Sequence, residues 1–380
     1  MKKSFIICLV IVIIVVASIL SCLYYKNINN AQTTTKISTI EENIKTKVYG
    51  ILNVPMEKNN MIWCGTLQLA WNELRDNIIK EDIQLISENK ISGELNKKAF
   101  TKEYLNDKDY IVMVGYNKDG IVEKINKLLK KKFNEEGNWE VQTNLQRPDD
   151  ILAYSFLKKN LEFEYAFEDI KDGLEFNSVK VKIKAFGIYE TKDEEIKNKL
   201  AKQVKILYYN NDNDFIISLK GKATNNDNDF IISLKGKATN DEVILAKILP
   251  KNTLDSTLNY ALSNSGKERA FSTSDILEVP MFQFNINKKF KELQNKSIAN
   301  AGFEDYILAS AIQRIDFSLT EKGAQLKSKA EISLTKSAHI LEAPKKLIFD
   351  KPFLLYMKEK DNTKPYFVMW VDNPEIMLHK

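Results

Sequence analysis

The stretch FDKPFLLYMKEKDNTKPYFVMWVDNP, residues 349–374, decides the fold expected for this chain. Two apolar runs, 353–357 and 366–371, flank a polar segment that contains Asp361, Asn362 and Pro365. Aliphatic and aromatic runs on either side of turn-forming residues are typical of two strands joined by a turn. The end of the chain is therefore expected to form a strand–turn–strand unit.

The segment EKGAQLKSKAEISL, residues 321–334, precedes this unit and alternates with a period of two. Counted onward from Gly323, one face carries Ala324, Leu326, Ser328, Ala330, Ile332 and Leu334, and the lysines at 327 and 329 fall on the other. A strand with one apolar face can be inserted into a sheet or can lie at the surface. Both interpretations, an inserting loop and an ordinary surface strand, stay open on this pattern.

Upstream, the hydrophobic periodicity indicates helices first and strands mostly later, without regular βαβ alternation. Helices are expected over 61–79, 120–133, 255–264 and 304–313, and strands over 109–116, 179–189, 203–209, 242–249 and 278–286. This order is typical of an α+β architecture. The chain has 380 residues, of which 44% are hydrophobic, so it can bury a large core.

The C-terminal third resembles the serpin family. The residues that match in order and spacing are TEKGAQ (320–325) as a hinge, followed by Phe349, Pro352, Phe353, Phe367, Met369, Asn373 and Pro374. Weaker similarity lies in 242–261, in VPMFQF (279–284) and in 60–71, where Cys64 and Gly65 replace a Ser-Pro pair. The resemblance covers roughly 40–374 and is strongest over 242–374.

The resemblance implies a single serpin-like α+β domain over 41–380, with a multi-sheet antiparallel or mixed β core and about eight or nine helices. It also implies an exposed reactive-type loop at about 324–345. Inhibitory serpins let a protease cut this loop, insert it as a strand into a central sheet, and trap the protease covalently. The implied hinge residues are Glu321, Lys322, Gly323, Ala324 and Leu326, and the candidate scissile region is Lys336, Ser337, Ala338, His339, Ile340 and Leu341.

The hinge departs from the inhibitory pattern at two positions. Ala324 stands where a hydroxyl residue is usual, and the bulky Leu326 stands where a small one is expected. Overpacking opposes entry of a strand into a packed sheet. Phe163 is the nearest candidate for the tryptophan of a family motif. We therefore expect loop-mediated binding of a protease or another protein, with no inhibition or only weak inhibition. The alternatives are a working suicide inhibitor of serine or cysteine proteases, and a structural or binding lipoprotein without loop function.

The N-terminus predicts attachment to a membrane. Lys2 and Lys3 precede an apolar run from Phe5 to about Leu23, which is long enough to span a hydrocarbon core. The lysines favour a cytoplasmic N-terminus, with the body outside. Residues 19–22, ILSC, resemble a bacterial lipobox with Cys22 as the lipidated residue, so 1–26 is either an anchor or a lipoprotein signal, followed by a polar tether over 27–40.

Residue inventory argues against an enzyme. His339 and His379 are the only histidines, Cys64 is the only cysteine of the body, and no glycine-rich phosphate loop is present. Cys64 with His339 is a conceivable nucleophile and base, but the apolar surroundings of Cys64 favour a buried inert thiol. We expect no catalytic residue, no cofactor and no metal, and a monomer.

Charge gives no argument for nucleic acid as a partner. The formal net charge is +5, and Lys2, Lys3 and Lys26 of the N-terminal segment account for three of these charges. The body is thus almost balanced, and the basic stretch 124–133 is interpreted as a solvated helix face.

One stretch, NNDNDFIISLKGKAT, fills 210–224 and again 225–239 without a substitution. Two identical copies indicate a tandem duplication rather than a repeat architecture, with an extra hairpin or bulge as the expected result. The Asn/Asp run lacks the glycine and glutamate of a calcium loop and is better interpreted as a turn.

Overall fold

The C-terminal unit forms an antiparallel hairpin at the centre of the largest sheet, as the sequence predicts. Strand β17 (Phe353–Glu359) pairs with β18 (Phe367–Val371), and Leu355 lies opposite Met369. Both strands are almost fully buried. A strand covered on both faces needs apolar side chains at successive positions, which is why this stretch is a continuous apolar run rather than an alternating one.

The computed structural model describes residues 45–87, 89–134, 139–141, 145–159, 161–189, 191–220, 241–266, 268–323 and 344–380. Residues 40–380 belong to one compact unit, and 1–39 are assigned to another. No helix within the described ranges is long and apolar enough to cross a membrane. The anchor, Cys22 and the tether lie outside those ranges.

An eight-stranded sheet has the order β1-β2-β18-β17-β11-β10-β9-β12. Its strands besides the hairpin are β1 (Thr46–Tyr49), β2 (Asn60–Cys64), β9 (Val204–Asn211), β10 (Asp214–Lys220), β11 (Asp241–Lys247) and β12 (Arg269–Ala270). Only β1 and β2 are parallel neighbours; the other pairs are antiparallel.

The remaining strands form a four-stranded sheet and three strand pairs. The four-stranded sheet has the order β16 (Lys346–Ile348), β13 (Ile276–Pro280), β8 (Ala185–Ile188) and β5 (Glu168–Asp169). The pairs are β14 (Phe282–Lys289) with β15 (Ile312–Leu319), β3 (Tyr110–Tyr116) with β4 (Ile151–Leu157), and β6 (Leu174–Glu175) with β7 (Lys182–Ile183).

The helices in the described ranges are α2 (Thr66–Glu73), α3 (Lys90–Asn96), α4 (Ile121–Phe133), α5 (Glu194–Ala201) and α6 (Leu254–Asn264). Helix α2 continues as a π-helical turn, Leu74–Ile79, and short 3-10 turns occupy Lys102–Tyr104, Asn117–Asp119 and Pro374–Ile376. The α+β class is confirmed. These five α-helices compare with the eight or nine expected for the whole chain, part of which is outside the described ranges.

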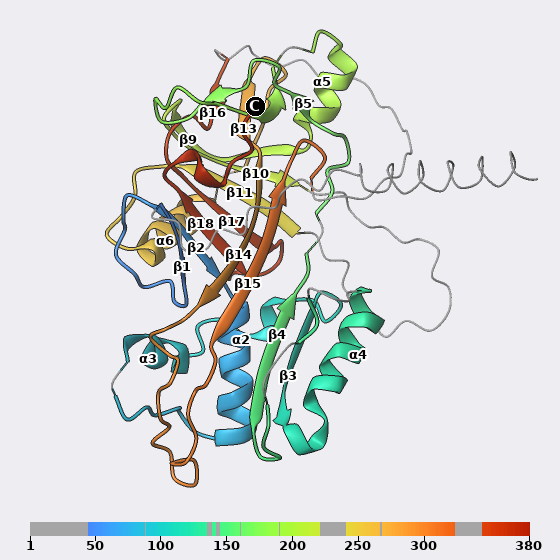
Figure 1. The fold of residues 1–380 in the computed structure, drawn as a ribbon. Helices are drawn as coiled ribbons and strands as arrows, with labels where there is room; N and C mark the ends of the chain where they lie inside the picture. The colour runs from blue at the N-terminus through green and yellow to red at the C-terminus, as the bar shows by residue number, and fades with distance from the viewer. Residues whose placement is uncertain are drawn as a thin grey trace, which may run out of the picture. The chain divides into compact units, whose positions relative to one another are not determined.

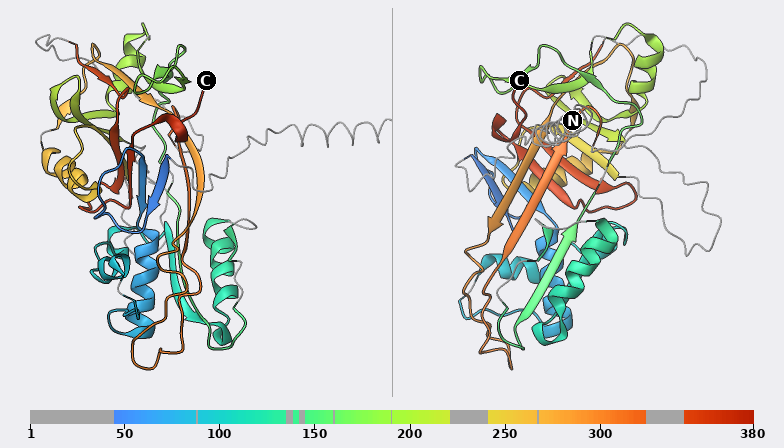
Figure 2. Two further views of the ribbon diagram at one scale, coloured as in Figure 1. Left: turned by 60° about the vertical axis from the view of Figure 1, so that its left-hand side comes forward. Right: turned by 45° about the vertical axis from the view of Figure 1, so that its right-hand side comes forward.

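Two features of this arrangement position the site (Figures 1 and 2). The β3–β4 pair lies between α2 on one side and α4 on the other. Helix α2 also contacts β15, so it touches a strand of each pair. The β3–β4 pair has its own small core with α4, formed by Ile111, Ile125 and Phe156 among others.

Two helix predictions are corrected by the structure. Residues 60–64 form β2 rather than the start of a helix, because they lie buried between β1 and β18, and the helix begins only after Gly65. Residues 304–313 form no helix: the Tyr306 carbonyl accepts from the Ile298 amide, the Leu308 amide donates to the Lys296 carbonyl, and the last two residues already belong to β15. In both places tertiary pairing outweighs a helical apolar pattern.

The duplicated stretch is described only in part. Its first copy supplies β10, the strand between β9 and β11. Residues 221–240 lie outside the described ranges, so the expected extra hairpin or bulge stays a prediction.

Candidate functional site

The predicted hinge begins with an anchored turn at the end of β15. The amide of Gly323 donates to the carbonyl of Thr320 at 3.1 Å, and the Thr320 hydroxyl donates to the carbonyl of Gly323 at 3.2 Å. The segment that follows β4 binds this turn from the other side. There the Phe163 amide donates to the Lys322 carbonyl at 3.3 Å, and the Phe167 amide donates to the Glu321 carbonyl at 2.8 Å.

Gly323 is the residue that permits this arrangement. Its φ of +83° lies in the left-handed region, which side chains disfavour. A Cβ there would lie 2.4 Å from the Leu161 carbonyl oxygen and 2.8 Å from the Phe163 nitrogen. Gly323 also forms a β-bridge with Glu162. The turn therefore requires glycine for both its conformation and its close approach to 161–163.

Aromatic packing supports the segment that holds the turn. Phe163, the residue matched to the family tryptophan, is buried and packs edge-on against Phe167 with centroids 4.9 Å apart. Both rings contact Phe186 of β8. The anchor of the hinge is thus fixed to the core rather than to a surface loop.

Strands β4 and β15 do not pair with each other in the described part of the chain, although α2 contacts both, and we call this break between the two strand pairs the opening. In the described part of the chain β4 pairs only with β3, and β15 pairs only with β14. Within the described residues each strand therefore keeps one edge without a partner strand, and α2 contacts both strands. Unpaired strand edges accept a further strand.

Three buried polar atoms on β4, on β15 and near the anchored turn have no hydrogen-bond partner in the described residues. They are Ser155 Oγ on β4, Gln313 Oε1 on β15 and Glu162 Oε1 beside the turn. Burying such atoms unpaired costs about 1–3 kcal/mol each.

Gln313 nevertheless holds β15 to the helix behind it. Its amide nitrogen donates to the carbonyl of Cys64 at 2.9 Å and to the hydroxyl of Thr66 at 2.8 Å. Both acceptors lie at the junction of β2 and α2. This clamp was not found from the sequence, because Gln313 lies in a stretch that favoured a helix.

The structure places only part of the predicted site. Glu321, Lys322 and Gly323 form the anchored turn, and an ion pair of 3.5 Å joins the side chains of Glu321 and Lys322. Ala324, Leu326 and the scissile candidates Lys336, Ser337, Ala338, His339, Ile340 and Leu341 lie outside the described residues. Their roles stay predictions.

Cys64 lies where an inert thiol is expected. It ends β2, is buried, and packs in the main core. Burial raises the pKa of the Cys64 thiol, with hydrogen bonds from Thr66 and Gly65 opposing this in part. A thiol whose pKa is raised forms little thiolate near neutral pH, and only the thiolate is a good nucleophile. No cluster of three possible metal ligands occurs within the described ranges.

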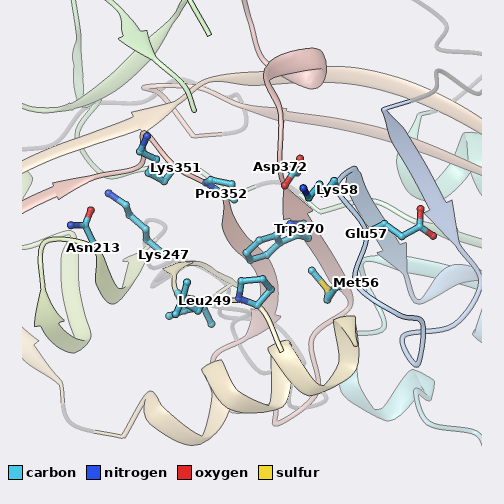
Figure 3. A pocket seen from close by; sticks show the side chains of 12 residues that line it. Met56, Glu57, Lys58, Asn213, Lys247, Leu249, Lys351, Pro352, Trp370 and Asp372 are labelled. Carbon is cyan, nitrogen blue, oxygen red and sulfur yellow. The ribbon is translucent and has the colours of Figure 1, made fainter. Parts of the chain in front are cut away.

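A hollow of about 510 Å³ lies at the opposite end of β17 from Glu359. Figure 3 shows Trp370 and Leu249 among its apolar lining, and Lys247, Lys351 and Lys58 around it. The ammonium of Lys247 is already bound by the Asp350 carboxylate at 2.7 Å and by the Ile348 carbonyl at 2.8 Å. None of the described residues that line the hollow is a serine, threonine or cysteine that a neighbouring base could activate as a nucleophile.

Sequence reasoning missed a buried charge cluster. Lys159, directly after β4, contacts the carboxylates of Asp109, Asp241 and Glu359. Because these residues are far apart in the sequence, nothing in their local patterns distinguishes them from solvated charges.

Comparison with known proteins gives similarity of fold. No family model and no curated protein sequence matches the chain. A solved structure of Serpin48, from the insect Tenebrio molitor, is similar with 12% identity and a TM-score of 0.47, covering 83% of this chain and 92% of that one. A thyroxine-binding globulin complex with thyroxine has 13% identity and a TM-score of 0.43, covering 84% and 94%. A human thyroxine-binding globulin complex has 12% identity and a TM-score of 0.44, covering 84% and 93%.

The three TM-scores lie between 0.43 and 0.47. At these identities the similarity concerns the fold alone. The functional argument therefore rests on the turn, the opening and the charges of this chain.

Proposed function

We propose that this chain is a non-catalytic protein that presents residues 324–343 to a protease or to another protein. The observation that carries the proposal is the anchored turn at Gly323. It fixes one end of that segment against 161–167, and β16 in the four-stranded sheet fixes the other end. A segment held between two fixed points is suited to binding by a partner.

The anchored turn also opposes insertion before cleavage. A strand that enters beside β15 has to break the bridge between Gly323 and Glu162 and the two backbone bonds from Phe163 and Phe167. Leu326 adds volume at a position where a small residue is expected. Presentation without insertion is therefore the first candidate function.

A second candidate, suicide inhibition of a serine or cysteine protease by loop insertion, is favoured by the opening between β4 and β15. Two unpaired strand edges over α2 are the acceptor that such a mechanism needs. Of the side chains on the apolar face of 324–334, the largest are Leu326, Ile332 and Leu334. Full burial of each contributes about 1.5–3 kcal/mol.

One experiment separates these functions. Residues 27–380 are nicked once between 324 and 341, and the melting temperature is measured before and after. Presentation without insertion predicts an unchanged melting temperature, whereas insertion predicts a large rise. A protease complex that survives SDS would establish the second candidate and exclude the first. If no partner binds the intact segment and the nick has no effect, the structural lipoprotein alternative holds.

We further propose that the N-terminal segment tethers the body outside the cytoplasmic membrane. The apolar run that begins at Phe5 and the preceding lysines support this placement. Protease treatment of intact cells should release the body if it faces outward. Incorporation of a labelled fatty acid that is lost in Cys22→Ser would show a lipoprotein, and its absence would favour an uncleaved anchor.

A further inference from the structure

Four side chains, Lys159, Asp109, Asp241 and Glu359, form what we call the Lys159 cluster. The Lys159 ammonium lies 2.7 Å from Asp109, 3.0 Å from Asp241 and 2.5 Å from Glu359. The lysine side chain is only 6% exposed, and those of Asp241 and Glu359 are 7% and 13% exposed. One buried cation therefore faces three carboxylates.

The cluster joins the β3–β4 pair to the eight-stranded sheet. Asp109 directly precedes β3, and Lys159 closely follows β4. On the other side, Asp241 begins β11 and Glu359 ends β17. A backbone bond of 2.8 Å from the Lys158 amide to the Asp109 carbonyl holds the two ends of the pair together. Movement of β4 relative to β11 and β17 has to separate these charges.

The carboxylates of the cluster differ in the hydrogen bonds that they accept from other neighbours. Glu359 also accepts hydrogen bonds from the Asn106 amide at 2.7 Å and from the Asn362 side chain at 3.3 Å. Asp241 Oδ1 is buried, and its close polar contact within the described residues is the Lys159 ammonium at 3.0 Å. The ring of Tyr366 lies 5.0 Å from the Lys159 nitrogen and supplies no charge. Nearby, Glu242 and Lys358 pair with each other at 3.5 Å.

The excess of carboxylates over cations makes Asp241 the carboxylate of this cluster that is protonated most readily. A buried carboxylate is costly unless it is paired, and a single cation cannot fully offset three. Burial first of all, together with the charges of Asp109 and Glu359, raises the pKa of Asp241 to about 6 despite the opposing effect of Lys159. Burial alone would lower the pKa of Lys159. The Asp241 and Asp109 carboxylates outweigh this effect, so the pKa of Lys159 is raised and the lysine stays charged.

We propose that the Lys159 cluster is a proton-operated latch, in which uptake of one proton tightens the contact between the β3–β4 pair and the eight-stranded sheet. Because the folded pKa of Asp241 exceeds its ordinary value of 3.8, the stabilisation is complete below that value and is lost as pH rises through about 6. The latch is therefore tight in mildly acidic surroundings and loose near neutral pH. It does not depend on what residues 324–343 bind.

The test compares the full chain with Asp241→Asn, which keeps the shape of the side chain without its charge. Thermal unfolding is measured at about pH 5 and about pH 7.5. On acidification the wild type should gain about 3 °C relative to Asp241→Asn. Asp361→Asn, an exposed change in the turn between β17 and β18, is the matched control and should follow the wild type. Parallel pH profiles for wild type and Asp241→Asn would overturn the proposal.

Two further measurements separate a latch from a general effect on stability. At pH 7.5 the amides of β3 and β4 should exchange hydrogen several-fold more slowly in Asp241→Asn than in the wild type, with little change in β10. Equal exchange in β3 and β4 would contradict the latch. Carbon NMR of labelled aspartate in the wild type should show one carboxyl titrating near pH 6. If every aspartate titrates near its ordinary pKa, the proposal is refuted. This measurement needs only the wild type and so holds even if the variant does not fold.

Discussion

The guanidinium carbon of Arg314 lies 4.5 Å from the centre of the Trp139 ring, so β15 contacts the segment that connects α4 to β4. Trp139 in turn packs edge-on against Phe156 of β4, with centroids 5.4 Å apart. Arg314 belongs to the exposed face of β15. The opening is therefore bridged on its outer side by one cation–π contact.

Removal of this contact should make the opening easier to enter. A cation–π contact at an exposed site contributes about 0.5–1 kcal/mol. Trp139→Ala and Arg314→Gln should each speed the annealing of a peptide of sequence AQLKSKAEISLT by about two- to fivefold, measured by native gel shift. Arg269→Gln, on the distant strand β12, is the control. The double variant should be no faster than either single one, and additive effects would argue against a shared contact.

Gly323→Ala should weaken the anchored turn rather than the whole fold. A Cβ at this position meets the Leu161 carbonyl, and the left-handed conformation costs a non-glycine residue about 1–2 kcal/mol. The amides of Phe163 and Phe167 should then exchange faster with deuterium. Gly93→Ala is the matched control, because nothing lies within 4 Å of the added Cβ in α3. The control should stabilise the chain by up to about 1 kcal/mol. Unchanged exchange at Phe163 would show that the turn is not held through Gly323.

Deletion of residues 225–239, the second copy of the duplicated stretch, should leave the fold intact. The first copy already supplies every side chain of β10, and the shortened connection to β11 would be GKATN, which suits a hairpin loop. Each halving of a loop recovers about 0.6 kcal/mol, so stability should rise by about 1 kcal/mol in urea unfolding. A fall in stability would mean that the second copy makes contacts of its own.

Cys64 should be unreactive until the core opens. Its thiol is buried, and burial raises its pKa, so iodoacetamide should modify it in urea but not in the native chain. Mass spectrometry of the peptide that contains Cys64 measures this directly. Rapid native labelling would instead indicate that β2 and the start of α2 separate readily.

Local sequence determined those elements whose stability comes from their own residues. Helix α6 begins where Thr253 and Ser256 form a capping box, and α4 has one apolar stripe and a lysine-rich face, so both bounds were predictable. The hairpin of β17 and β18 is likewise fixed by two apolar runs and a polar turn. The resemblance indicated Gly323 as a hinge residue, whereas its left-handed conformation and its close approach to 161–163 were found only in the structure.

Only the tertiary structure decided the remainder, because it depends on partners that are distant in the sequence. Residues 60–64 form a strand since β1 and β18 lie on either side, although their apolar pattern also suits a helix. The Gln313 clamp and the Lys159 cluster bring together groups whose local sequences resemble those of surface residues. Charge and apolar periodicity determine which segments can be buried, but the burial of a particular charge depends on what the folded chain places beside it.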